Sequence, residues 1–229
     1  MGLFDNLKTD SSIEEEKDTL GGGFRTLDTG IYNCTMSLAY IDYSKGGAMS
    51  VNMVFKTEEG KELKQTQYIT SGKEKGCKNY YETKDGKKRY LPGFNIVNDI
   101  CLLTVGKEIS ELDPEEKTIP IYNPDLGKEA PTKRNVLMDL KDQEVTLGII
   151  KKKEPKYNDP SQVREVNEIN KVFRTKDSFT VAEIKSQADA PDFYTKWSER
   201  YTSDYVLDKT NGKKPSANDE KPKSSLFGG

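Results

Sequence analysis

The chain has 229 residues, of which 33% are hydrophobic and 32% charged, and its formal net charge is −2. This composition suits one elaborated domain or two small ones, and it excludes a uniformly basic coat for nucleic acid. There is no histidine, and the three cysteines are scattered without a CxxC pair. We therefore expect no histidine-dependent catalysis, no disulfide framework and no four-ligand zinc site, in a protein of a reducing compartment.

The first 23 residues predict a flexible acidic arm. Six acids face only Lys8 and Lys17 in residues 1–20, and the GGGF that follows lacks the Gly-Lys-Ser/Thr of a phosphate-binding loop. The arm has no basic region followed by an apolar run, so we expect no secretory signal. No stretch of the chain is apolar enough to predict a membrane span.

Three strands are predicted next, over 30–41, 48–55 and 62–70, because their residues alternate between apolar and polar. Short turns separate them, which indicates an antiparallel meander. In the third strand Lys64, Thr66 and Tyr68 share one face.

A basic stretch rich in tyrosine follows, over 73–90. It contains seven cations and three acids, a local charge of +4, and an Asp-Gly pair predicts a hairpin turn. Cations suit phosphates, and tyrosine rings suit stacking on unpaired bases. A tight turn puts Tyr81 opposite Tyr90, so we predict that these two stack on bases and that Tyr80 packs inward. The alternative, in which the tyrosines belong to a barrel wall and the lysines to a solvated rim, stays open at this point.

After Pro92 the hydrophobic period becomes helical, and Gly106 marks the predicted end of this helix. A short strand is expected over 118–122 and a loop over 123–134. Two later strands, 145–153 and 164–174, are predicted to pair as a second basic hairpin with Tyr157 in its loop.

The C-terminal part predicts two helices and a tail. A capping box at Thr180 opens the first helix, and the second begins at Pro191. Its aromatic stripe predicts packing onto the sheet: Phe193, Trp197 and Tyr201. Residues 203–229 are polar and aperiodic, which predicts a disordered tail with an apolar tip at Leu226 and Phe227.

These elements predict a mainly β fold with added helices. The expected form is an elaborated OB-fold barrel with a central helix between the third and fourth strands, basic hairpin extensions and a C-terminal helical segment. Residues 24–202 would form this domain, between the arm of 1–23 and the tail of 203–229. Loops at the mouth of such a barrel bind oligonucleotides. The candidate DNA-binding residues lie on the third strand and the two basic hairpins: Lys64, Tyr68, Lys73, Lys75, Lys78, Tyr81, Lys87, Lys88, Arg89, Tyr90, Lys151, Lys153, Tyr157 and Arg164.

The chain, over roughly residues 20–200, resembles the single-stranded-DNA-binding proteins of tailed, podovirus-type bacteriophages. The resemblance rests on GGGF, IYNCTMSLAYI, SKGGAMSVNMVF, KNYYETKDGKKRYLPGFNIVNDICLLTVG, VTLGIIKKK and NKVFRT. It implies an OB-fold that coats single-stranded DNA in phage replication and recombination, without sequence preference or cofactor, in the host bacterial cytoplasm. We also expect a monomer or weak homo-oligomer, and we expect the apolar tail tip to recruit replication or recombination proteins. The tail departs from the acidic tail usual in that family, since it has four acids and five lysines.

Two other classes fit parts of the sequence. A metal-dependent nuclease needs converging carboxylates, but the acids occur in runs such as EEE and DPEE that are typical of solvated faces. A structural or interaction protein would account for the polar tail and its apolar tip, but not for the basic tyrosine hairpins. Our expectation is therefore a DNA-binding protein without catalytic residues, metal or cofactor.

Overall fold

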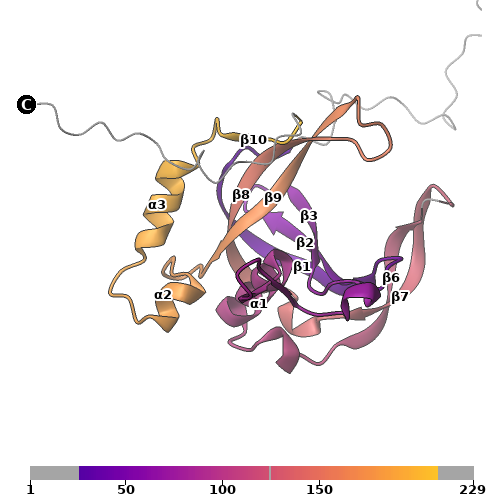
Figure 1. The fold of residues 1–229 in the computed structure, drawn as a ribbon, viewed down its shortest axis with the longest axis horizontal. Helices are drawn as coiled ribbons and strands as arrows, with labels where there is room; N and C mark the ends of the chain where they lie inside the picture. Colours follow the sequence, from indigo (N-terminus) through magenta and orange to yellow (C-terminus); the bar gives the residue numbers. More distant parts are fainter. Residues whose placement is uncertain (1–25, 124, 211–229) are drawn as a thin grey trace, which may run out of the picture.

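A computed structural model describes residues 26–123 and 125–210 (Figure 1). Within them the chain forms an eight-stranded, largely antiparallel sheet, a separate two-stranded hairpin and three α-helices. The predicted mainly β fold is confirmed. No helix of this part of the chain is long and apolar enough to cross a lipid bilayer.

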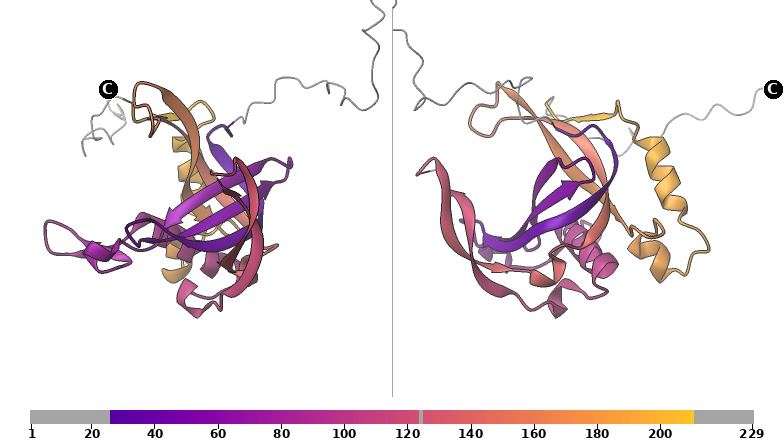
Figure 2. Two further views of the ribbon diagram at one scale, coloured as in Figure 1. Left: turned by 90° about the vertical axis from the view of Figure 1, so that its right-hand side faces the viewer. Right: turned by 180° about the vertical axis from the view of Figure 1, so that it is seen from behind.

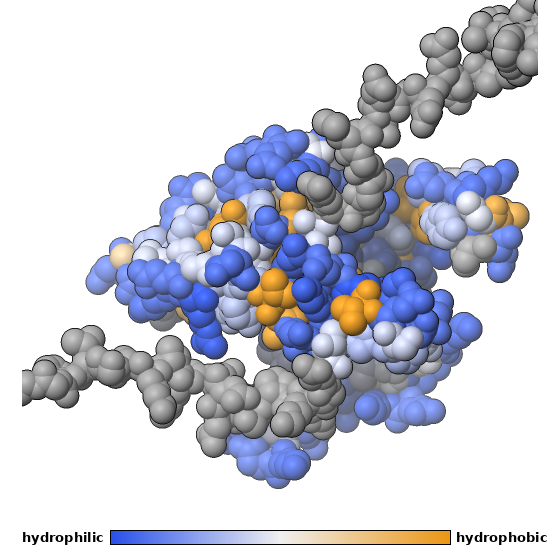
Figure 3. Space-filling view, turned by 90° about the horizontal axis from the view of Figure 1, so that it is seen from above, coloured by the Kyte–Doolittle hydropathy of each residue, from blue (hydrophilic) through white to orange (hydrophobic). Residues whose placement is uncertain are grey.

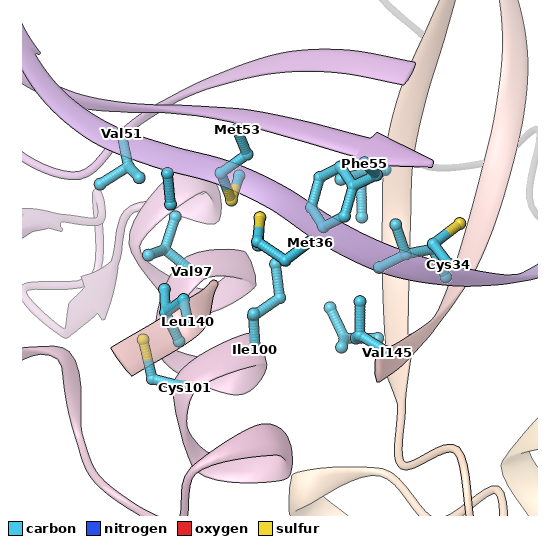
Figure 4. Close-up of a cluster of buried hydrophobic side chains, with 14 of the residues drawn as sticks. Cys34, Met36, Val51, Met53, Phe55, Val97, Ile100, Cys101, Leu140 and Val145 are labelled. Carbon is cyan, nitrogen blue, oxygen red and sulfur yellow. The ribbon is translucent and has the colours of Figure 1, made fainter. Parts of the chain in front are cut away.

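The first three strands form the predicted antiparallel meander: β1 (Gly30–Tyr43), β2 (Met49–Thr57) and β3 (Glu62–Tyr68). Their alternation buries Met36, Met53 and Phe55 in the core (Figure 4). A β-bulge between Met36 and Leu38 bends β1, because the extra residue has no partner on β2. The first residues of β1 pair with a later strand, β8.

Helix α1 (Pro92–Thr104) covers the core where the helical period predicted it. Proline at its first position suits a helix start, and Val97 and Ile100 are fully buried with the side chains of β1 and β2 (Figure 4). Gly93 allows a close approach to β3, because a Cβ there would lie 2.3 Å from the carbonyl oxygen of Tyr68. A side chain at this position would push α1 away from the end of β3.

A long hairpin, β6 (Glu115–Asn123) and β7 (Lys128–Val136), stands away from the rest of the sheet (Figure 2). The predicted loop over 123–134 is therefore wrong. Prolines suggested a loop, but Pro120 and Pro131 lie opposite each other in the hairpin. At such a position neither residue has to donate a hydrogen bond to its partner strand.

The second long hairpin is present as predicted, with β8 (Glu144–Pro155) paired to β9 (Val163–Phe173). A short strand, β10 (Val206–Asp208), runs parallel to β8. Its residues were predicted to belong to the tail, so the predicted boundary at 203 lies too early. Three residues are too few to show a hydrophobic period. A contact remote in sequence holds the residue just before them, since the Thr29 hydroxyl donates to the carbonyl of Tyr205 at 2.6 Å.

The remaining helices are short. Helix α2 (Val181–Lys185) begins at the predicted capping box, in which Thr180 and Glu183 bond each other's backbone N–H groups, and α3 (Asp192–Arg200) follows. Single turns of 3₁₀ helix connect other elements: η1 (Lys73–Lys75), η2 (Ile109–Glu111) and η3 (Met138–Leu140).

Trp197 fixes α3 to the sheet, as its spacing predicted. The side chain is 2% exposed and packs with Ile150 and Phe173. Its indole N–H donates to Asn170 Oδ1 at 2.8 Å. The ring lies directly over Gly148, where a Cβ would come within 2.9 Å of it.

No closed barrel is present within the described residues, so the predicted OB-fold barrel is not confirmed. Strands β3 and β9 are the two edges that face each other, and the side chain of Gln65 bridges them. Its amide donates to the carbonyl of Asn167 at 2.9 Å and accepts from the N–H of Ile169 at 3.4 Å. One side chain therefore takes the place of a backbone ladder at this seam.

Candidate nucleic-acid interface

The basic, tyrosine-rich stretch forms a hairpin, β4 (Tyr80–Glu82) and β5 (Lys88–Tyr90), that projects from the sheet (Figure 2). The predicted register is wrong, because Tyr80 lies opposite Tyr90, and Tyr81 lies opposite Arg89. A two-residue Asp-Gly turn would have paired Tyr81 with Tyr90. Here the N–H of Thr83 donates to the carbonyl of Lys87, so the turn holds Lys84 as well and the register shifts by one.

A groove of about 950 Å³ lies between this hairpin, the end of β3 and the loop that joins β1 to β2. We call it the tyrosine groove. Its side walls carry the aromatic and charged side chains of interest: Tyr68, Tyr80, Tyr81, Lys75, Lys78, Glu74 and Glu82. Thr66, Gln67, Pro92 and Gly93 also line it, so the close packing of α1 on β3 shapes the groove.

Three tyrosines share the tyrosine groove but differ in exposure. Tyr68 is 51% exposed and Tyr81 is 44% exposed, so both rings have a free face for a ligand. Tyr80 is half-buried, and the ammonium groups of Lys78 and Lys88 lie 5.4 and 5.0 Å from its ring centroid. These contacts are attractive cation–π interactions, so Tyr80 holds two cations beside the groove.

Tyr90 belongs to a different surface. Its ring centroid lies 5.0 Å from that of Phe94 on α1, and Tyr90 does not line the tyrosine groove. The pair of exposed rings that faces one groove is therefore Tyr68 with Tyr81, in place of the predicted Tyr81 with Tyr90.

The positive charge of the first hairpin is largely uncompensated. Among the seven cations of residues 73–90, only Lys87 forms an ion pair within the described residues, with Asp85 at 3.3 Å. The stem of Lys73 packs beside Gly47, where a Cβ would lie 2.6 Å from the lysine Cγ. The remaining cations are exposed and available to a polyanion.

A second groove, of about 330 Å³, follows the seam between β3 and β9, and we call it the seam groove. It shares Thr66, Gln67 and Pro92 with the tyrosine groove, so the two grooves adjoin there, and we call them together the trough. Its lining adds Lys64, Lys152 and Arg164. The trough therefore joins the two hairpins that the sequence marked as basic.

Carboxylates neutralise most of the charge in the seam groove. Lys152 Nζ lies 2.7 Å from Glu154 and 3.1 Å from Glu168, and Arg164 lies 2.7 Å from Glu154. Burial alone would lower the pKa of Lys152, but the hydrogen bonds to both glutamates outweigh burial and the pKa is raised. Residues 151–168 contain five cations and four acids, so this hairpin is much less basic than the first.

We predict that Glu154→Gln strengthens the binding of single-stranded DNA and makes it more dependent on salt. Glu154 holds both Lys152 and Arg164, and the hydrogen bond from Lys152 lowers its pKa. The carboxylate therefore stays charged until the pH falls through this lowered value. At neutral pH only mutation frees Arg164, and it leaves Lys152 with Glu168 as its one carboxylate partner. The slope of log affinity against log salt should steepen by about 0.7 for each phosphate gained.

Glu129→Gln is the matched control for this prediction, because it makes the same charge change at an exposed site on the β6–β7 hairpin. Equal gains in affinity from the two variants would mean that only net charge matters, and would contradict a role for the seam groove.

Several predicted site residues lie outside the trough. Lys151 lies 3.3 Å from Asp28 and 3.4 Å from Glu165, and Lys153 lies 3.5 Å from Glu165. The ring of Tyr157 is 93% exposed at the tip of its loop. The others outside the trough are on the first hairpin: Lys73, Lys87, Lys88, Arg89 and Tyr90. Leu226 and Phe227 lie outside the described residues.

The trough also contains residues that the sequence analysis missed, chiefly Lys152 and Thr66. The alternation of side chains along a strand was the signal that could have identified both residues. Thr66 shares a strand face with Tyr68, and Lys152 must point away from its neighbours Lys151 and Lys153. The two outer lysines that the sequence analysis chose thus lie on the face of β8 that is outside the trough.

Within residues 26–123 and 125–210, no three His, Cys, Asp or Glu side chains gather in a way that could hold a metal ion. The three cysteines are free thiols, and burial raises the pKa of Cys34 and of Cys101 to about 12. No protein-family model matches the chain, and no curated protein matches its sequence.

Proposed function

We propose that this chain binds single-stranded DNA without sequence preference, by stacking tyrosines on bases and contacting phosphates with lysines and arginines. The observation that carries the proposal is the tyrosine groove, in which two exposed rings face the same space beside uncompensated cations. Base–aromatic stacking contributes about 1–3 kcal/mol per base and tolerates any sequence, because every base has a π-face.

The order of the strands supports an OB-fold origin for the domain. Strand β1 pairs with both β2 and β8, β8 and β9 form a hairpin, and α1 lies in the chain between β3 and β8. This matches a five-stranded, partly open OB barrel in which Gln65 bridges the last seam. The β4–β5 and β6–β7 hairpins are then insertions on either side of the helix.

The resemblance noted above extends the proposal to a biological role. The chain would coat single-stranded DNA during replication and recombination of a tailed phage, in the host cytoplasm, and replication or recombination proteins would bind its C-terminal residues. A polar surface fits a soluble coat: the face seen in Figure 3 is mostly hydrophilic, with small separate apolar spots.

Titration of labelled oligo-dT at increasing salt tests the proposal. Affinity should fall with a log–log slope of about 0.7 for each phosphate contacted, and duplex DNA of equal length should bind far more weakly. Oligonucleotides of other sequences should bind comparably to oligo-dT.

Equal affinity for duplex and single strand would remove stacking from the account. Absence of salt-dependent binding to oligo-dT would refute the proposed function altogether, whereas turnover of the oligonucleotide would indicate a nuclease.

A further inference from the structure

The trough continues beyond the two grooves to the place where the described chain begins. A third groove, of about 190 Å³, is lined by Thr26 and Leu27 and shares four residues with the seam groove: Lys64, Gln65, Val166 and Asn167. The side chain of Asn167 holds the backbone of Leu27 by two hydrogen bonds. It accepts from the N–H of Leu27 and donates to the carbonyl of Leu27, both at 2.8 Å.

The segment attached at this point is acidic. Residues 1–25 contain six acids and three cations, and four of the acids lie close together: Glu14, Glu15, Glu16 and Asp18. These four precede Thr26 by 8 to 12 residues, a reach of at most about 25–40 Å. The part of β3 that joins the seam groove to the tyrosine groove, from Lys64 to Tyr68, spans only about 13 Å.

We propose that residues 1–25 bind in the trough of their own chain and compete there with single-stranded DNA. The charges are complementary, because the segment is negative and residues 73–90, at the far end of the trough, have a local charge of +4. The segment is attached at Thr26, which lines the third groove, and its length covers both grooves. The competition with DNA rests on the proposed function, whereas the binding of the segment does not.

The expected effect follows from the tether. A short flexible tether gives an effective concentration of about 1 mM, so a segment with a dissociation constant of about 0.1 mM would occupy most of the trough. The apparent affinity for DNA falls by the fraction of trough left empty, here about tenfold. Salt weakens this competition as it screens the charges.

The first experiment removes charge at two places. One variant replaces the four clustered acids by their amides: Glu14→Gln, Glu15→Gln, Glu16→Gln and Asp18→Asn. The control variant makes an equal charge change on the exposed β6–β7 hairpin, which lines none of the three grooves: Glu115→Gln, Glu116→Gln, Asp125→Asn and Glu129→Gln. The probe is labelled oligo-dT in low salt and in high salt.

We expect the segment variant to bind oligo-dT about tenfold more tightly than the control variant in low salt, with the difference lost in high salt. Equal binding by the two variants would overturn the inference and leave only an effect of net charge.

A second experiment needs no DNA. Cys77 is exposed in the basic stretch, while Cys34 and Cys101 are buried, so a nitroxide maleimide will modify Cys77. If the segment binds in the trough, the label should broaden the amide NMR signals of residues 14–18, and high salt should restore them. Unbroadened signals in low salt would overturn the inference. If the signals broaden but oligo-dT does not bind, the proposed function fails and the docking of the segment stands.

Discussion

Replacing Tyr81 with alanine should weaken the binding of oligo-dT by about 1–3 kcal/mol, or roughly 5- to 150-fold, because a stacking face is lost. The ring is 44% exposed and lines the tyrosine groove, so its removal leaves no buried cavity. The melting temperature should therefore change little. Fluorescence anisotropy of a labelled oligonucleotide gives the affinity, and thermal unfolding gives the stability.

Tyr90→Ala is the matched control, because the same residue type is changed on the same hairpin. Tyr90 packs on Phe94 outside the tyrosine groove, so its loss should affect DNA binding much less. An equal or larger loss of affinity in Tyr90→Ala would show that DNA follows the outer side of the hairpin.

The largest expected effect on stability is that of Trp197→Ala, at about 3–5 kcal/mol of unfolding free energy. The indole is 2% exposed, packs against Phe173 and Ile150, and donates a hydrogen bond to Asn170. Alanine would leave a cavity over Gly148 and an unsatisfied acceptor. Urea unfolding followed by circular dichroism measures the loss.

Phe193→Ala is the control on the same helix. Phe193 is 42% exposed, so its truncation should cost about 1 kcal/mol or less. If the two variants lose the same free energy, α3 does not hold to the sheet through Trp197.

Sequence periodicity was sufficient for the elements that build the core. The meander and helix α1 each bury one face over many residues, so the pattern of apolar side chains repeats often enough to be read. In β8 the residues from Val145 to Ile150 are all buried, so this strand shows as a short run without alternation. Strand β10 and the β6–β7 hairpin could not be predicted this way. Strand β10 has three residues, and Pro120 and Pro131 resemble loop residues until their pairing is known.

The candidate site depended on finer information. Tyr80 and Tyr81, and Lys151 and Lys152, differ only by one position, and a shift of one residue moves a side chain to the other face of a strand. The turn at Lys84 decides the first choice, and the register of β8 with β9 decides the second. Neither the turn nor the register can be read from the composition of the sequence.

Compensation of charge was also invisible in the sequence. Glu154 follows three lysines, and its distance to Arg164 depends on how β9 returns beside β8. The first hairpin keeps its charge because its acids, apart from Asp85, meet no cation within the described residues. Counting cations in the sequence therefore overstated the free positive charge of the β8–β9 hairpin but not that of residues 73–90.

The paired prolines of the β6–β7 hairpin bear on aggregation. The hairpin stands away from the sheet, and apart from the pairing of Val136 with β1 the described residues cover neither of its long edges. In this facing pair the backbone nitrogens point away from the partner strand, toward the exposed edges of the hairpin. Proline has no N–H group, so Pro120 and Pro131 each remove a hydrogen-bond donor from an exposed edge. A strand of another molecule cannot extend the sheet past such a position. The proposed coating of a long polymer would bring many copies close together, and these prolines would keep their sheets from joining edge to edge.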